Sequence, residues 1–446
     1  MEMTNGEKEQ MTYEQAMEYM DDLQSYGSVP GLTNIINLCE KLGNPQERLK
    51  FVHIAGTNGK GSTLAFISEI LKEAGYRVGR YISPTIFEYR ERIQVNGRMI
   101  TKKDLCRLMT EVKDACEALG REGKAHPTPF EVETALGFLY FVEKECDIVV
   151  LETGLGGEQD ATNLIQNTLV AVLASVSMDH MGILGNSLSE IAMQKAGIIK
   201  DGCRVVSTLQ ETEVQTVIEE KCRQYNVPLM IADGSRATKI KSTLEKQRFS
   251  YGKYKDAEIS LIGRYQIHNA VLAIEAVESL SLCGYPVSEK AVYAGLKKAV
   301  WPGRFQLLCK KPVFIADGAH NRDGAARLAQ SVEFYFTNKR IIYIMGILRD
   351  KEQEEIIRQT CSYAHQILTV PTKGARGTSS YELACEVSRY CGNVTALDSV
   401  QEAVELSFLM ADKDTVIIAF GSLSYLGELI TTVENRDKIR SDSHGK

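Results

Sequence analysis

The chain has 446 residues, 44% of them hydrophobic and 25% charged, and its formal net charge is −6. This length exceeds that of a typical single hydrophobic core, so it predicts a globular protein of two domains. The acidic balance argues against a nucleic-acid partner, because a nucleic-acid-binding protein needs a basic face or stripe. A nucleotide site stays possible, since it needs only local positive charge.

The cysteines and the apolar runs indicate the cellular compartment of the protein. The 11 cysteines are scattered and form no C-x-x-C pair, which is typical of reduced thiols in a cytoplasmic protein rather than of a disulfide framework or a zinc site. The first ten residues are acidic and polar, without the apolar core of a signal peptide. The most apolar runs, such as residues 169–178, are too short to span a bilayer. We therefore expect a cytoplasmic protein with no membrane partner.

Helical and strand patterns alternate along the first 300 residues, which predicts a mostly parallel sheet covered by helices. Residues 229–260 change to short β-like pieces rich in Lys, Ser and Tyr. The predicted helices are residues 13–43 (interrupted at Pro30-Gly31), 64–74, 101–119, 129–144, 187–198, 266–283 and 288–300. The predicted strands are residues 51–55, 77–82, 147–151 and 169–176, and residues 88–97 are predicted to form a loop or hairpin.

The alternation restarts after residues 301–304, where a Pro-Gly pair breaks the preceding helix. The sequence therefore predicts an α/β protein of two domains. Residues 1–300 would form a P-loop-containing, mostly parallel sheet domain, and residues 301–446 a smaller Rossmann-like α/β domain with a frayed polar tail from residue 435. The predicted strands of the second domain are residues 313–316, 341–345, 366–370 and 415–420.

The segment between the first strand and its helix, residues 56–63, reads Gly-Thr-Asn-Gly-Lys-Gly-Ser-Thr. A strand, a glycine loop and a helix in this order present backbone N–H groups and a helix N-terminus to a phosphate. Lys60 adds a positive charge, and Ser62 or Thr63 a hydroxyl. The strict pattern G-x-x-x-x-G-K-[ST] is not matched, because Gly61 separates Lys60 from Ser62. We interpret the loop as a phosphate cradle; the alternative is a turn whose glycines only permit close packing.

Polar residues at the carboxyl ends of the strands are the next candidates, because ligands of open parallel sheets bind there. Ser83, Glu152 and His180 follow three strands of the first domain, and Lys195 lies on the next helix. An acidic residue in such a place suits a magnesium-binding carboxylate. Taken singly, each has an ordinary alternative, such as a solvated carboxylate, a structural histidine or a snorkelling lysine.

The second domain offers a similar group. Asp317 and His320 follow its first predicted strand, with a glycine turn between them. A strand-end Asp with a nearby His is a common arrangement for holding ribose, phosphate or a reacting carboxylate. Arg304, just past the junction, would reach a phosphate across the cleft between the domains.

Together these segments resemble the folylpolyglutamate synthase/dihydrofolate synthase family, ATP-dependent ligases related to the Mur ligases of cell-wall synthesis. The resemblance spans nearly the whole chain. Its most specific pieces are the loop with its inserted Gly61 and the run from Glu152 to Asn163. Further matches lie at residues 30–32, 42–46, 81–84, 91–93, 130–131, 179–180, 195–197, 268–270, 302–305, 317–321 and 421–423.

The resemblance implies roles for the site residues. The ATP phosphates would be bound by the loop residues Gly56, Thr57, Asn58, Gly59, Lys60, Gly61 and Ser62, with further ATP contacts from Asn269, Arg304 and Asp317. Ser83, Glu152 and His180 match the family's magnesium ligands. Lys195 matches a lysine that the family carries as a carbamate, an added carboxylate that assists metal placement.

The resemblance also implies the reaction. A substrate carboxylate attacks the γ-phosphate of ATP, and the amine of L-glutamate then displaces phosphate to form an amide. We expect tetrahydrofolate synthase activity together with dihydrofolate synthase activity on dihydropteroate, in folate biosynthesis and one-carbon metabolism. The expected cofactors are ATP, two Mg²⁺ ions and carbamylated Lys195, and the expected state is a monomer. Lys60 and His180 would neutralise charge in phosphoryl transfer, and His320 and Asp317 are the candidates for the base that deprotonates the amine.

The chain departs from the family pattern in a few places. Asn34 stands where an arginine is usual, which puts a charged contact to the pterin-carrying substrate in question. Gln194 replaces the usual glutamate before Lys195, and Arg322 and Ser424 are further departures. None of them falls on a phosphate or metal position.

Two other functions compete with this one. A Mur-type cell-wall amino-acid ligase would need an additional N-terminal domain for its UDP-linked substrate, whereas the first strand here is predicted already at Phe51. A non-catalytic P-loop ATP-binding protein would need the cradle, but not the strand-end residues and Lys195 as well.

Overall fold

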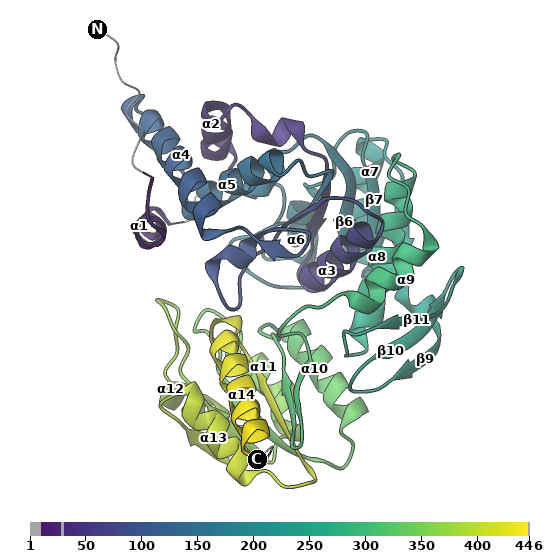
Figure 1. Cartoon of the computed structure of the whole chain (residues 1–446). Coiled ribbons are helices and arrows are strands. Elements are labelled where there is room, and N and C mark those ends of the chain that lie inside the picture. The colour runs from purple at the N-terminus through teal and green to yellow at the C-terminus, as the bar shows by residue number, and fades with distance from the viewer. Residues whose placement is uncertain (1–9, 28–30, 445–446) are drawn as a thin grey trace.

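In the computed structural model, which describes residues 10–27 and 31–444, the strands form three sheets (Figure 1). The largest belongs to the N-terminal domain and has the order β4-β3-β2-β5-β1-β6-β7-β8. Strands β2, β5, β1, β6, β7 and β8 run parallel, and β3 and β4 are antiparallel additions at one edge. The strands are β1 (Phe51–Ala55), β2 (Val78–Tyr81), β3 (Ile93–Val95), β4 (Arg98–Met99), β5 (Ile148–Glu152), β6 (Thr168–Leu173), β7 (Arg204–Thr208) and β8 (Leu229–Ala232).

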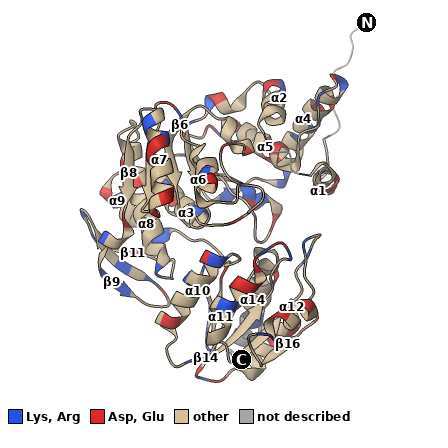
Figure 2. Cartoon of the chain, turned by 180° about the vertical axis from the view of Figure 1, so that it is seen from behind, with Lys and Arg blue, Asp and Glu red and all other residues tan. Residues whose placement is uncertain are grey.

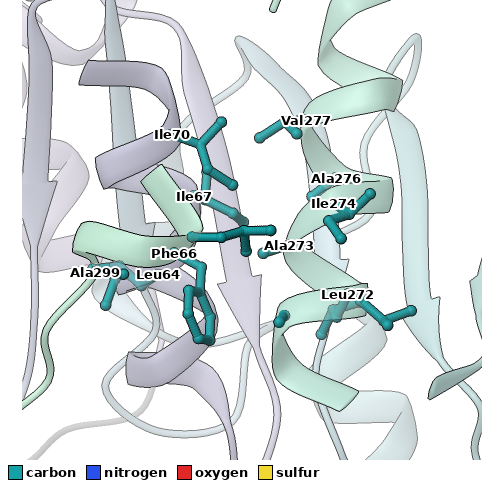
Figure 3. Packing of buried hydrophobic residues seen from close by; sticks show 14 of the residues in the cluster. Leu64, Phe66, Ile67, Ile70, Leu272, Ala273, Ile274, Ala276, Val277 and Ala299 are labelled. Carbon is teal, nitrogen blue, oxygen red and sulfur yellow. The ribbon is translucent and has the colours of Figure 1, made fainter. Parts of the chain in front are cut away.

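Helices cover both faces of this sheet, so its central strands are apolar on both sides. Val52 and Ile54 of β1 lie in the cluster beneath α3 (Lys60–Glu73), α8 (Tyr265–Ser281) and α9 (Glu289–Lys298). Figure 3 shows Ile67 and Ile70 of α3 facing Ala273 and Val277 of α8 in that cluster. The opposite face carries α1 (Tyr13–Asp22), α2 (Thr33–Lys41), α4 (Lys102–Arg121), α5 (Pro129–Glu143), α6 (Leu188–Ala196) and α7 (Thr212–Gln224).

A small antiparallel sheet follows, in the order β11-β10-β9, formed by β9 (Thr238–Ser242), β10 (Gln247–Tyr251) and β11 (Tyr254–Ile259). Phe249, Ala257 and Ile259 pack into the cluster of α8 and α9.

On the face drawn in Figure 2, acidic and basic residues are interspersed over both domains, with basic residues gathered on β9. Within residues 10–27 and 31–444, no helix combines the length and the apolar character that crossing a membrane requires.

The C-terminal domain is built on a second mixed sheet in the order β12-β13-β17-β14-β15-β16, in which only β12 is antiparallel to its neighbour. Its strands are β12 (Gln306–Lys310), β13 (Val313–Ala316), β14 (Arg340–Met345), β15 (Gln366–Thr369), β16 (Val394–Ala396) and β17 (Thr415–Phe420). One face carries α10 (Arg322–Tyr335), α11 (Gln353–Thr360) and α12 (Ser380–Val387), and the other α13 (Val400–Met410) and α14 (Leu423–His444).

The predicted fold class is confirmed, with corrections to several elements. Helix α3 begins at Lys60 rather than Leu64, so the phosphate loop is shorter than predicted and its lysine lies in the first helical turn. Strand β6 ends at Leu173 instead of Val176. The polar tail was expected to fray from residue 435, but α14 continues to His444. The boundary at residue 300 stays a prediction, and the predicted interruption at Pro30 lies outside the described residues.

Candidate active site

The carboxyl ends of the parallel strands of both domains open onto one cleft of about 910 Å³. All the site residues that the sequence predicts line this cleft, although they come from eight different segments of the chain. They are Gly56, Thr57, Asn58, Gly59, Lys60, Gly61, Ser62, Ser83, Glu152, His180, Lys195, Asn269, Arg304, Asp317 and His320. Of the departures from the family pattern, Gln194 and Ser424 also line the cleft, whereas Asn34 lies on α2 and is not among its lining residues.

The phosphate loop is fastened to the end of β6. The backbone N–H groups of Thr57 and Asn58 donate to the carbonyl oxygen of Ser175 over 2.7 and 3.2 Å. Gly59, at φ +92°, leads into α3, whose N-terminus has no side-chain cap from the described residues. A helix N-terminus without a cap leaves N–H donors and the positive end of the helix dipole for an anion. The loop geometry therefore suits phosphate binding.

The inserted Gly61 has a steric explanation. Its Cα lies against the ring of Trp301, and a Cβ built at position 61 would overlap the indole atoms. Trp301 is 8% exposed, and the Arg80 guanidinium lies 4.8 Å from its ring centre. The chain segment that joins the two domains thus packs directly against the first turn of the phosphate-binding helix, and this contact needs glycine at position 61.

The hydroxyl of Ser62 does not point freely into the cleft. Its oxygen accepts a hydrogen bond from Gln266 Nε2 at 3.1 Å, and Gln266 Oε1 accepts one from Asn269 Nδ2 at 2.9 Å. The amide of Asn269 lies over the loop, because a Cβ at Gly59 would be 2.6 Å from Asn269 Oδ1. Gln266, which no motif of the sequence marks, therefore connects the loop hydroxyl to the predicted ATP contact on α8.

Two of the predicted metal ligands, Ser83 and Glu152, stand at the ends of the adjacent strands β2 and β5, and His180 follows β6, which β1 separates from β5. Glu152 is the last residue of β5 and is 5% exposed, and its carboxylate accepts a long hydrogen bond of 3.5 Å from the backbone N–H of Ser83. Burial raises the pKa of Glu152, and the nearby Lys60 opposes that shift. With one long hydrogen bond, this buried carboxylate keeps oxygen lone pairs for a further partner, so the donor set of Glu152 Oε, Ser83 Oγ and a His180 nitrogen fits a bound cation.

The site is open rather than closed around a metal. In the part of the chain that the structure describes, no three His, Cys, Asp or Glu side chains converge to hold an ion. Mg²⁺ commonly binds through one or two carboxylates and completes its shell with water and substrate phosphates. Burial lowers the pKa of His180, which keeps its imidazole neutral and able to act as a ligand.

Lys195 reaches the phosphate loop from α6. Its Nζ donates to the carbonyl oxygen of Gly56 at 3.0 Å, and the side chain is buried. Burial first, and the neighbouring Lys60 second, lower the pKa of Lys195 to about 7. A substantial fraction of Lys195 is therefore an uncharged amine near neutral pH, which is not the state of a solvated lysine.

In the C-terminal domain, the Asp317 carboxylate is fully engaged. It accepts hydrogen bonds from the N–H of Phe305 at 2.7 Å, the N–H of Ala319 at 2.8 Å and the Tyr265 hydroxyl at 3.1 Å. Burial raises the pKa of Asp317, while the nearby Arg304 opposes the shift. The Arg304 guanidinium lies directly over Gly318, where any Cβ would overlap it. Asp317 therefore organises the segment that carries Arg304.

His320 is held differently. Its Nδ1 lies 2.7 Å from the carbonyl oxygen of Gly318, so in the neutral ring this nitrogen carries the proton and donates. Burial and the positive charge of Lys351 lower the pKa of His320 to about 4. The ring is therefore neutral at pH 7, and the lone pair of Nε2 can accept a proton.

Several cleft residues escaped the sequence reasoning. Lys351, Arg327 and Tyr265 line the cleft without being predicted, and Asp179 is predicted only as part of the family match at residues 179–180. Lys351 follows β14 in a polar loop, so the strand-end rule could have found it. Arg327 and Tyr265 lie on helices and follow no motif, so no sequence signal marked them.

Two family models and several relatives match this chain. The model described as the Mur ligase middle domain matches residues 54–277, and the model described as the Mur ligase, glutamate ligase domain matches residues 303–423. The dihydrofolate synthase/folylpolyglutamate synthase of Bacillus subtilis is 35% identical over 426 residues, which cover 94% of this chain and 98% of the relative. The folylpolyglutamate synthase of Lacticaseibacillus casei is 32% identical over 94% of this chain and 98% of its own length.

Solved structures extend the comparison to three dimensions. A folylpolyglutamate synthase from Thermotoga maritima superposes with a TM-score of 0.82 at 33% identity, covering 94% of this chain and 96% of the other. The Mycobacterium tuberculosis folylpolyglutamate synthase, solved with ADP and AMPPCP, gives a TM-score of 0.87 at 27% identity over 94% and 99% of the two chains. An Escherichia coli relative solved with DHPP and ADP superposes with a TM-score of 0.83 at 27% identity, covering 95% of this chain and 98% of the other.

Proposed function

The chain belongs to the folylpolyglutamate synthase/dihydrofolate synthase family of the Mur ligases, and from this membership we propose that it joins L-glutamate to the carboxylate of a folate or of dihydropteroate through an acyl phosphate made from ATP. The observation that carries the proposal is the single cleft between the two domains, in which the phosphate loop and Glu152 face Arg304 and His320. A site shared by two domains brings two substrates and a nucleotide together and excludes water when it closes.

The first step forms the acyl phosphate. A carboxylate oxygen of the pterin substrate attacks the γ-phosphorus of ATP, and the bond from that phosphorus to the β,γ-bridging oxygen breaks, releasing ADP. Such a transfer needs positioning and charge neutralisation more than proton transfer. Lys60 in the first turn of α3 and Arg304 above Gly318 line the cleft from the two domains, and we assign this neutralisation to them.

Mg²⁺ would be held by Glu152, Ser83 and His180, and when bound it supplies charge neutralisation and in-line alignment of the phosphates. The support for this assignment is the buried carboxylate of Glu152, whose one hydrogen bond is long, and the neutral imidazole of His180 in the same cleft. A second ion, held with carbamylated Lys195, is part of the proposal. The pKa of about 7 and the buried position of Lys195 favour this modification, because only an uncharged amine reacts with carbon dioxide.

The second step forms the amide. The nitrogen of glutamate attacks the acyl carbon, the carbon–oxygen bond to phosphate breaks, and the amine loses a proton. Of the two candidate bases, the contacts favour His320, whose Nε2 keeps its lone pair, over Asp317, whose oxygens already accept three hydrogen bonds. We therefore assign Asp317 to positioning Arg304 and the following turn.

The same proposal covers the state of the protein. We propose that the domains meet near residues 300 and 301 and that the enzyme acts as a monomer in the cytoplasm. The support for a reducing compartment is that all 11 cysteines are free thiols.

One assay tests the proposal against its rivals. ADP release by the purified protein is measured with L-glutamate and, in turn, dihydropteroate, tetrahydrofolate and a UDP-linked muramoyl substrate. We expect glutamate-dependent ADP release with one or both pterin substrates. Release only with the muramoyl substrate would identify a cell-wall ligase, and release with none would favour a non-catalytic ATP-binding protein.

Lys60→Ala should lower the rate about a hundredfold or more, because the transferred phosphoryl group loses a preorganised charge.

A further inference from the structure

A group of polar side chains crosses the cleft outside the assigned catalytic residues. We call it the cross-cleft cluster; its N-terminal-domain members are Asn58, Ser175 and Asp179, and its C-terminal-domain members are Asn321, Asp323, Arg327 and Lys351. Most of its bonds join the start of α10 to the phosphate loop or to the segment that follows β6. Asn58 Nδ2 donates to Asp323 at 2.8 Å, and Arg327 donates to the Ser175 hydroxyl at 2.7 Å.

One branch of the cluster leads to the metal-ligand candidate His180. Asp179 Oδ1 accepts from Lys351 Nζ at 3.0 Å and from the backbone N–H of His180 at 2.9 Å. Asp179 Oδ2 accepts from Asn321 Nδ2 at 3.0 Å. Both donor side chains belong to the C-terminal domain, so this carboxylate joins the other domain to the backbone of His180.

The backbone of His180 needs such support. Its φ is +51°, in the left-handed region that residues other than glycine adopt only when their surroundings hold them there. The hydrogen bond from its N–H to the preceding carboxylate is a local contact that stabilises this conformation. The orientation of the imidazole therefore depends on where the Asp179 carboxylate is fixed.

The pair of Asp179 and Lys351 is too buried to be a surface ion pair. The two side chains are 12% and 9% exposed. A buried pair is costly to desolvate, and removing one partner leaves an uncompensated charge. If the domains separated, Asp179 would lose both Lys351 and Asn321, and the restraint on His180 would relax.

We propose that Lys351 is a positioning residue that, through Asp179, holds His180 in its metal-binding orientation only while the two domains are together. The proposal rests on the assignment of His180 as a metal ligand. It makes the approach of the C-terminal domain a condition for a complete metal site. Phosphoryl transfer would thus be confined to the closed cleft from which water is excluded.

The test measures metal affinity without turnover. Binding of Mn²⁺ to the full-length protein in the presence of ADP is followed by the electron paramagnetic resonance signal of free Mn²⁺. We expect Lys351→Met to weaken Mn²⁺ binding about tenfold or more, the usual effect of losing a partner that orients a metal ligand. Lys351→Arg should restore most of the affinity, and ADP binding without metal should stay as in the wild type.

Matched variants separate the possible outcomes. Arg327→Gln removes another cross-cleft bond without touching Asp179 and should leave Mn²⁺ affinity unchanged, as should Lys339→Met, which removes an exposed pair with Asp414. A folded Lys351→Met protein that binds Mn²⁺ like the wild type overturns the proposal. If Lys351→Met does not fold, Lys351→Gln is measured with the same criteria. If His180→Gln itself leaves Mn²⁺ affinity unchanged, the metal assignment in the proposed function fails, and the role of Lys351 fails with it.

Discussion

Lys60 and Lys195 donate to the same oxygen. Their Nζ atoms lie 3.1 and 3.0 Å from the carbonyl oxygen of Gly56, at the start of the phosphate loop. Two ammonium groups on one acceptor repel each other, and the buried Lys195 is the one whose pKa is lowered. Carbamylation would turn this repulsion into attraction, because the lysine then carries a negative charge beside Lys60.

We therefore expect activity to depend on dissolved carbon dioxide. The wild-type rate should fall in CO₂-depleted buffer and return with bicarbonate, and labelled bicarbonate should give a carbamate ¹³C resonance. With a pKa of about 7, the neutral amine gains population as the pH rises from 6 to 8. The CO₂ concentration that gives half of the maximal activity should therefore fall over that range.

The Lys195→Met variant should show no carbamate ¹³C resonance. Its rate should fall about a hundredfold or more, which is the usual effect of losing a preorganised charge. Lys200→Met is the matched control, since Lys200 is also partly buried with a lowered pKa but donates to Asn163. It should keep the bicarbonate response. A Lys195→Met enzyme that works at full rate and ignores bicarbonate would contradict the carbamate.

The contact between Gly61 and Trp301 leads to a second prediction. Gly61→Ala forces a methyl group into the indole ring, and overpacking of this kind costs about 1–3 kcal/mol. Because the strain falls on the first turn of α3, we expect ADP affinity, measured by calorimetry, to drop about tenfold, equivalent to about 1.4 kcal/mol. Adding Trp301→Leu should recover part of it.

The control for this variant is Gly120→Ala. Gly120 lies in α4, and a methyl group there would meet no atom of the described residues within 4 Å, so this substitution should leave ADP affinity unchanged. Unchanged affinity in Gly61→Ala itself would mean that the loop does not need the close approach of Trp301.

Local sequence patterns predicted the strands and helices that carry the site, but they did not predict the contacts between those elements. The apolar run 51–55 predicted β1 with its observed bounds, because that signal is confined to five neighbouring residues, whereas the start of α3 was predicted four residues too late. The edge strand β12 was missed, since its side chains are only half buried and show no apolar run. Strand β7 and helix α7 were also missed, although Val214, Ile218 and Cys222 follow a helical spacing.

The contacts between domains could not be predicted in the same way. Lys351 meets Asp179 across 172 positions of sequence, and no local pattern encodes such a pair. The partner of Gly61 is similarly distant, so the departure from the strict nucleotide pattern could be noticed in the sequence but explained only by the position of Trp301.

His320 provides the third prediction. His320→Gln keeps a polar side chain but removes the basic lone pair, so amide formation should slow by about 10²–10⁴-fold, the usual contribution of a general base. ADP affinity should be unchanged. Trapping the acyl phosphate with hydroxylamine should still succeed in this variant, because the first step does not use the imidazole. A variant that forms the amide at the wild-type rate would exclude His320 as the base.

The last prediction concerns stability in acid and starts from His53 on β1. The Thr162 hydroxyl donates to Asp160 at 2.5 Å, so its oxygen accepts from His53 Nε2 at 2.9 Å, and the buried Nδ1 has no partner among the described residues. Protonating Nδ1 would place a charge in the core, and burial lowers the pKa of His53 to about 3. Between about pH 6.5 and 3 the unfolded chain therefore binds a proton that the folded protein excludes.

The free energy of unfolding should consequently fall as the pH drops through this window, by at most about 1.4 kcal/mol per pH unit for this one group. His320, with a pKa of about 4, adds to the same trend above pH 4. His53→Gln keeps a donor for Thr162 but cannot be protonated, so urea unfolding from pH 6.5 to 4 should show a shallower loss than in the wild type. If the free energy of unfolding fell equally steeply with pH in the two proteins, His53 would already take up its proton in the folded state. The lack of an acceptor for Nδ1 among the described residues argues against that outcome.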